Sequence, residues 1–289
     1  MANDTSTGYA SNWNVANVTG DGLITFSATQ YPFLARTAGM KVAASDEYAM
    51  SAQYALEAFA QPAITEAGSV TAPTAVAYDR SNEVNAIQIF QKSVAVTYAR
   101  QSAANRLKFA ESGTSGYAYA NDPLANPVLD ELAFQTNAAK EQAYGDLEVS
   151  ALTGTYAKST AANVANKMRG IITACSSNTV AASSAKLDKI MIDELLAEMA
   201  TSGAKFVRPV IFANAFNKQM LSKIYEYLPM DRNIGGGNIQ RIETDFGIFE
   251  VVYNRNMPTS TVLFADMSAV YLVNQPVPGK AFMPDGMFC

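Results

Sequence analysis

The segment that most constrains the fold is Gln240–Val273, near the end of the chain. It holds three short runs rich in β-branched and aromatic residues: Phe246–Tyr253, Thr261–Phe264 and Ala269–Val273. Asn, Pro and Asp residues separate these runs, so we expect successive β-strands joined by tight turns. The first run is apolar on both faces, which predicts a strand inside a sheet with other elements packed on each side.

Residues 43–98 are expected to form one long excursion. Two strand-like limbs, Asp46–Phe59 and Val84–Tyr98, flank a middle rich in Gly, Pro, Ser and Thr. This pattern predicts a long hairpin. A two-stranded ribbon is only marginally stable by itself in water, so we expect something else to hold it. Either the chain's own core or a neighbouring molecule could do so.

A long helix is predicted at about 127–153. Apolar residues recur there at helical intervals, acidic residues lie in the first turn, and Gly154 offers a C-terminal stop. The helix would be roughly 35–40 Å long. The next section has an α/β pattern, with helices expected at Leu187–Ser202 and Ala215–Tyr227 around a buried strand, Pro209–Phe212.

Composition favours a chain that associates with copies of itself. Of its 289 residues 49 % are hydrophobic and only 16 % are charged, against about 25 % charged in an average soluble domain. A surface with so little charge suits a subunit that is buried against its neighbours, although a core of small residues would also explain it. The net charge is −5, and the basic residues are too scattered to form a sequence-specific DNA footprint.

Catalytic and metal chemistry find little support. The chain has no histidine, which is the usual general base and the commonest metal ligand, and Cys175 and Cys289 form no metal-binding motif. Asp245-Phe246-Gly247 spells a kinase tripeptide, but the His-Arg-Asp loop that kinases also need is impossible here. No apolar run could span a membrane. We therefore expect no catalytic residue, no metal and no cofactor.

The closing segment closely resembles that of tailed-bacteriophage major capsid proteins with the Hong Kong 97 fold. The likeness is to the branch in which a Thr-Asp-Phe-Gly strand leads to an Asn-Arg-x-Met-Pro turn, and a Glu-Ala-Gly hairpin tip adds to it. We infer assembly or fold roles, by resemblance, for Glu66, Gly68, Gly170, Thr244, Asp245, Phe246, Gly247, Asn254, Arg255, Met257 and Pro258.

The resemblance implies an α+β fold with four parts. Residues 1–42 would be an N-terminal arm and residues 43–98 an extension loop lying over the adjacent subunit. Residues 99–166 and 242–289 would form a peripheral domain around the long spine helix. Residues 167–241 would form an axial domain, whose loops gather around the symmetry axes.

The resemblance also implies a structural virion protein, not an enzyme. Its copies would form hexamers and pentamers of an icosahedral capsid enclosing double-stranded DNA, assembled in the cytoplasm of a bacterial host. The expected partners are the chain itself, a portal, a separate scaffold protein and the packaged DNA, which it would touch weakly and without sequence specificity. Cement proteins are left open as a further partner, and no membrane is expected.

Two other functions stay open at this point. An encapsulin-like cellular shell shares the fold but holds enzyme cargo, and a monomeric enzyme using carboxylates is more distant. The founding member of the fold joins its subunits through a covalent bond from an extension-loop lysine to a neighbour's asparagine. This chain has no lysine between Lys41 and Lys92, so we expect a shell without that crosslink.

Overall fold

A four-stranded mixed sheet forms the centre of the body. The computed structural model describes residues 30–54, 56–98, 109–112, 116–119, 131–225 and 239–275. The strand order is β7-β8-β6-β9, with bounds Arg241–Thr244, Gly247–Tyr253, Pro209–Ala213 and Leu263–Asp266. Strand β6 runs parallel to β8 and antiparallel to β9, while β7 and β8 form a hairpin.

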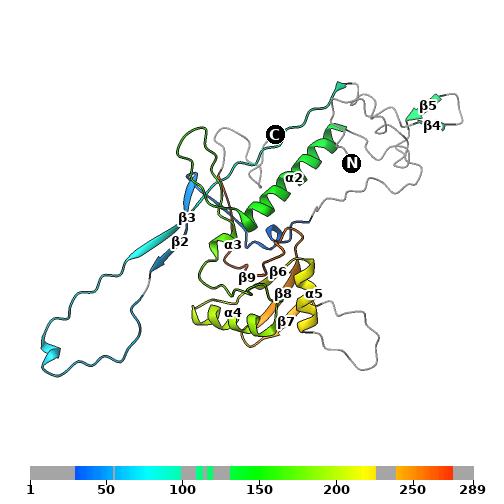
Figure 1. Ribbon diagram of the computed structural model, residues 1–289. Coiled ribbons are helices and arrows are strands. Elements are labelled where there is room, and N and C mark those ends of the chain that lie inside the picture. The colour runs from blue at the N-terminus through cyan, green and yellow to red at the C-terminus, as the bar shows by residue number, and fades with distance from the viewer. Residues whose placement is uncertain are drawn as a thin grey trace, which may run out of the picture.

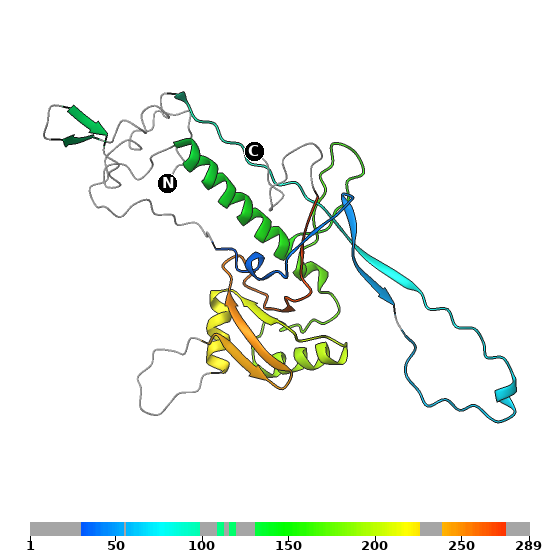
Figure 2. The same cartoon turned by 180° about the vertical axis from the view of Figure 1, so that it is seen from behind.

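The sheet is covered on both faces at β6, whereas β8, the strand for which the sequence predicted this, is covered only in part. Strand β6 is buried along its whole length because its side chains alternate between two cores. Ile211 and Ala213 pack against helices α4 (Lys189–Thr201) and α5 (Ala215–Ile224), whereas Val210 and Phe212 pack against Phe33 and the end of helix α2. Figures 1 and 2 show α4 and α5 against the sheet, with α2 leading away from it.

The helices begin where side chains cap them. The carboxylate of Asp188 accepts from the backbone amide of Lys189 at the start of α4, and the side chain of Asn214 accepts from the amide of Asn217 at the start of α5. Such bonds satisfy amides that have no partner within the helix. The predicted helices at 187–202 and 215–227 are thus present, with ends shifted by a few residues.

Helix α2 spans Glu131–Thr153, and the expected first turn at 127–130 lies outside the described residues. Only its C-terminal end is inserted into the core, through Ala151 and Leu152. After α2 the chain crosses its own path, because the amide of Gly170 donates to the carbonyl of Gly154 at 2.8 Å. A Cβ on Gly170 would lie 2.5 Å from the Gly154 nitrogen, so only glycine fits this approach. The short helix α3 (Ile171–Ala174) follows.

The predicted long hairpin is present and projects from the body (Figure 1). Strands β2 (Glu47–Tyr54) and β3 (Arg80–Ala86) pair antiparallel with a bulge between Ala49 and Ser51, and the loop between them carries the short helix η2 (Gly68–Val70). The return limb differs from the expected Val84–Tyr98 strand. Pairing ends at Ala86, and the chain then runs beside α2, where Lys92 and Asp146 form an ion pair of 2.6 Å.

The three closing strands exist, but their connections differ from the prediction. Strand β6 lies between β8 and β9, so these two do not pair directly. The third run gives β10 (Leu272–Asn274), which pairs in parallel with β1 (Met40–Val42) outside the central sheet. Phe246 lies in the turn before β8 instead of in the strand, and Ile248 is exposed. The order of these strands in the sheet is therefore not set by tight turns alone.

Three smaller elements complete the described chain. The short helix η1 spans Leu34–Arg36, just before β1. Strands β4 (Phe109–Ser112) and β5 (Gly116–Tyr119) form a separate hairpin. The mixture of helices and strands agrees with the expected α+β class. The expected arm, residues 1–42, is described only from residue 30, and the expected domain boundary at 241–242 falls inside β7.

Candidate functional site

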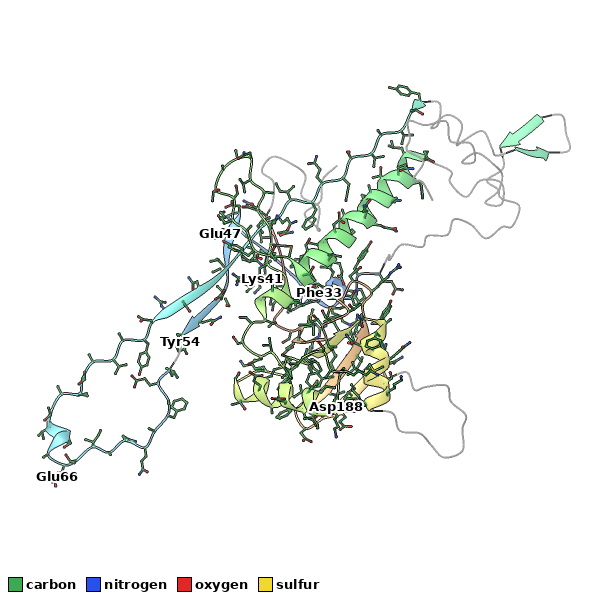
Figure 3. All side chains as sticks on the ribbon, in the orientation of Figure 1. Phe33, Lys41, Glu47, Tyr54, Glu66 and Asp188 are labelled. Carbon is green, nitrogen blue, oxygen red and sulfur yellow. The ribbon has the colours of Figure 1, made fainter. Side chains whose placement is uncertain are left out.

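The loop of the projecting hairpin exposes apolar side chains that have no cover within the described residues. Every residue from 56 to 79 is exposed. Phe59 is 92 % exposed and Val70 88 %, and the other large apolar residues in the loop are Leu56, Ile64, Val76 and Tyr78. Figure 3 shows the loop far from the body, with Tyr54 at its start and Glu66 at its tip. Side chains of this kind are normally buried, so this loop is the strongest candidate for a contact surface.

The tip of the loop is ordered by its own hydrogen bonds. The amide of Gly68 donates to the hydroxyl of Thr65 at 3.1 Å, and the hydroxyl of Ser69 donates to the carbonyl of Glu66 at 2.6 Å. A Cβ on Gly68 would lie 3.0 Å from that Thr65 hydroxyl, which is tighter than most Cβ contacts, so the Thr65 side chain would have to shift slightly. The side chain of Glu66 remains exposed at the end of the loop.

The root of the hairpin is held by residues 156–169, which we call the strap. The strap is closed by paired backbone bonds between Ala157 and Lys167. Its Lys158 ammonium forms a 2.6 Å ion pair with Asp46, and its Tyr156 hydroxyl donates to Glu47 at 2.6 Å. The bond from Lys158 holds the pKa of Asp46 at about 2, so this carboxylate stays charged at neutral pH.

The strap also holds the second strand of the hairpin. The guanidinium of Arg169 pairs with Glu83 at 2.7 Å. The side-chain amide of Asn85 binds both polar groups of the Arg169 backbone, accepting from its N–H at 2.7 Å and donating to its carbonyl at 3.2 Å. Gln88 accepts from the amide of Met168 at 3.1 Å. Both strands are therefore fastened to one loop.

The Thr-Asp-Phe-Gly residues form the turn between β7 and β8. The Thr244 hydroxyl donates to the carbonyl of Gly247 at 2.9 Å, and Gly247 has a φ of +140°, which favours glycine. Asp245 and Phe246 are exposed at the turn, and the Phe246 ring lies 6.0 Å from that of Phe206. The motif is thus a hairpin turn and not the beginning of a strand.

The Asn-Arg-x-Met-Pro residues follow β8, and Asn254 forms a buried junction there. Its side-chain amide donates to Glu148 of α2 at 2.6 Å, and both residues are fully buried. The same carboxylate accepts from the backbone amides of Phe33 and Leu34, each at 3.0 Å. One acid thus joins α2, the N-terminal segment and the last third of the chain. Met257 is in the core, Arg255 is exposed, and Pro258 is partly buried.

The residues singled out from the sequence therefore lie at four separate places. Glu66 and Gly68 are at the hairpin tip, Gly170 is at the end of α2, and the last two motifs are at opposite ends of β8. They hold local geometry and do not converge on one site. The sequence reasoning missed Glu148 and the acids and bases at the hairpin root. Glu148 could have been found, since it lies three and four residues before the buried Ala151 and Leu152, on the same helical face.

Comparison with known families decides the class of protein. The family model described as SU10 major capsid protein matches residues 4–284 of this chain. The chain belongs to this family. It is therefore a structural protein of a virion capsid, which confirms the capsid part of the prediction and implies self-association. No curated protein matches the chain.

Two structural findings concern other activities of this capsid protein. Among the described residues, no three His, Cys, Asp or Glu side chains lie close enough to hold a metal ion. In the same part of the chain, no helix has the length and apolar character needed to cross a bilayer.

Proposed function

We propose that this capsid protein has the Hong Kong 97 fold and assembles into hexamers and pentamers of an icosahedral shell around double-stranded DNA. Shell formation would take place in the cytoplasm of a bacterial host. In this proposal residues 43–98 are the extension loop, residues 167–241 an axial domain, and α2 is the spine helix of the peripheral domain. Membership of a major capsid protein family supports the proposal, together with the shape of the chain.

The exposed loop at residues 56–79 is the observation that carries this proposal. A ribbon with Phe59 and Val70 almost fully exposed gains little from the body that bears it. Burying these side chains on a neighbouring copy would remove a large apolar area from water, at about 25 cal/mol for each Å². Each subunit would grip others in the same way, so many weak contacts would add up to a stable shell.

Charge is consistent with a shell that touches its DNA weakly. The loop carries the acids Glu57, Glu66 and Asp79 and has no basic residue between Lys41 and Arg80. Such a loop would be repelled by phosphate and is better placed on protein. A portal and a separate scaffold protein are further proposed partners, because a closed shell needs an entry for DNA and control of its size.

Substitutions in the loop test the proposal. Phe59→Ser and Val70→Ser replace apolar side chains that are almost fully exposed, so we expect unchanged thermal unfolding of the dispersed protein. Assembly into shells, followed by electron microscopy and light scattering, should be lost or strongly reduced in the double variant. Gln61→Ser, in the same exposed loop but polar, is the matched control and should assemble normally.

Two outcomes would contradict this function. Wild-type protein that remains a folded monomer at high concentration would refute self-assembly, and shells of normal yield from the double variant would refute the role of the loop. The contents of the shells distinguish a virion from a cellular compartment. Nuclease-protected double-stranded DNA in particles from the natural source supports a virion, whereas enzyme cargo supports an encapsulin-like shell.

A further inference from the structure

A continuous path of contacts joins the projecting hairpin to α2. The strap is flanked by Gly154 and Gly170, whose backbones bond directly to each other at the end of α2. A Cβ at Gly154 would lie 2.6 Å from the carbonyl oxygen of Met168, so the crossing leaves no room for adjustment. The base of the strap is thus fixed to the helix.

The other end of the path is the clamp on the hairpin root. Lys158 and Arg169 each pair with an acid, Asp46 directly before β2 and Glu83 on β3. Asn166 adds a bond to Asp46 at 3.3 Å, and the Arg169 guanidinium lies 5.4 Å from the Tyr156 ring. A ribbon held on both strands can neither twist nor swing freely about its root.

We propose that the strap sets the angle between the extension hairpin and α2, and that this angle selects the curvature with which copies of the chain associate. The inference rests on the proposed shell function and assigns to it positioning residues on a loop away from the contact surface. Lys158 and Arg169 are these residues, since they act through the hairpin and not by touching a neighbour.

Each of these ion pairs adds little stability, but together they can fix the orientation of the hairpin because the hairpin is long. The loop tip lies about twenty residues beyond the clamp on each strand, so a small rotation at the root moves Glu66 a long way (Figure 3). Reversing one charge should have a larger effect than deleting it. Lys158→Asp would put a third carboxylate beside Asp46 and Glu47, and like charges at that distance repel.

A charge swap in the full chain tests the inference. The variants are Lys158→Asp, Asp46→Lys and the combination of the two, with Lys186→Asp as a control, because Lys186 is an exposed lysine outside the strap. Pulsed electron spin resonance would measure the distance between the loop tip and α2 in dispersed subunits. The spin labels are attached to new cysteines, at Ala67→Cys in the loop tip and Lys140→Cys in α2. The native cysteines are removed through Cys175→Ser and Cys289→Ser.

We expect a single narrow distance in the parent and in the control. Each single charge reversal should broaden or shift that distance and give shells of altered diameter or irregular shape in electron micrographs. The combined variant should restore both, which a merely damaged subunit would not do. Circular dichroism confirms that every variant is folded.

Specific outcomes would overturn the inference. An unchanged distance in both single variants refutes the role of the strap in orienting the hairpin. A changed distance with shells of normal diameter refutes the link to curvature. If the parent chain forms no shells, the proposed function itself fails, while the distance measurement still decides whether the strap orients the hairpin.

Discussion

Residue-level chemistry explains why several polar side chains lie in the interior. Glu148 and Asn254 are fully buried, and burial of a charge is costly unless hydrogen bonds compensate for it. The carboxylate accepts three such bonds, two from backbone amides and one from Asn254. Asn254 in turn accepts from the amide of Asn256 at 2.8 Å and so also closes its own turn. Sequence alone identified Asn254 through its motif but not its acidic partner, because that contact spans 106 residues of chain.

Replacing Glu148 should therefore destabilise the subunit. In Glu148→Gln one oxygen becomes an NH₂ group that faces a buried donor, so we expect the free energy of unfolding to fall by about 1–3 kcal/mol. The control is Glu141→Gln, which changes an exposed side chain on the same helix. It should change the free energy of unfolding by less than about 0.5 kcal/mol. Urea denaturation followed by fluorescence measures both, and equal effects would show that the junction is not a stabilising contact.

At the scale of elements, the local sequence pattern predicted which helices and strands exist better than it predicted how the strands pair. The helices around residues 190–225 and the strands of the closing segment follow from apolar periodicity and turn residues. The sheet order does not, because inserting β6 between β8 and β9 depends on contacts between distant segments. The return limb of the hairpin, which was expected to be a strand, is a second example of this dependence on distant contacts. Its apolar residues suit a strand, but beyond Ala86 the chain leaves its partner and follows α2.

Two glycines, one within α2 and one at the crossing after it, allow a test in which the expected changes in stability have opposite signs. A Cβ added to Gly170 would meet the Leu152 carbonyl carbon and oxygen at 2.7 Å, and backbone atoms cannot move aside cheaply. We expect Gly170→Ala to cost about 1–3 kcal/mol or more. Gly145→Ala, within α2, would meet only a Tyr31 ring atom at 3.8 Å and should stabilise by up to about 1 kcal/mol. Thermal unfolding would show the two shifts, and a neutral Gly170→Ala would contradict the close crossing.

The whole molecule is a body with a long extension. This extension was the feature of the overall shape that the sequence predicted best. Two strand-like limbs around a middle rich in Gly, Pro, Ser and Thr predicted the hairpin. Its direction was not predictable, because it depends on ion pairs between the root and a strap more than 80 residues away. Composition agrees with this shape, since a chain with so few charges exposes a loop of apolar residues.

The lack of lysine on the loop leads to a prediction about the assembled shell. No lysine lies between Lys41 and Lys92, so the loop cannot supply the amine for a bond to a neighbour's asparagine. Mature particles that are denatured and analysed by mass spectrometry should release single chains. Particles treated with a bifunctional amine reagent serve as the positive control. Covalent oligomers in untreated particles would contradict the expectation.

The position of β6 in the sheet also affects how the chain is made. A ribosome releases Pro209–Ala213 before either of its neighbours β8 and β9 exists. At roughly 5–20 residues per second, the last of these strands follows several seconds later. During that interval two apolar faces of one segment stay open to water. Newly made chains therefore pass through an aggregation-prone state with exposed apolar surface. Chaperone binding at this stage would favour folding, whereas contact between nascent chains on neighbouring ribosomes would favour aggregation.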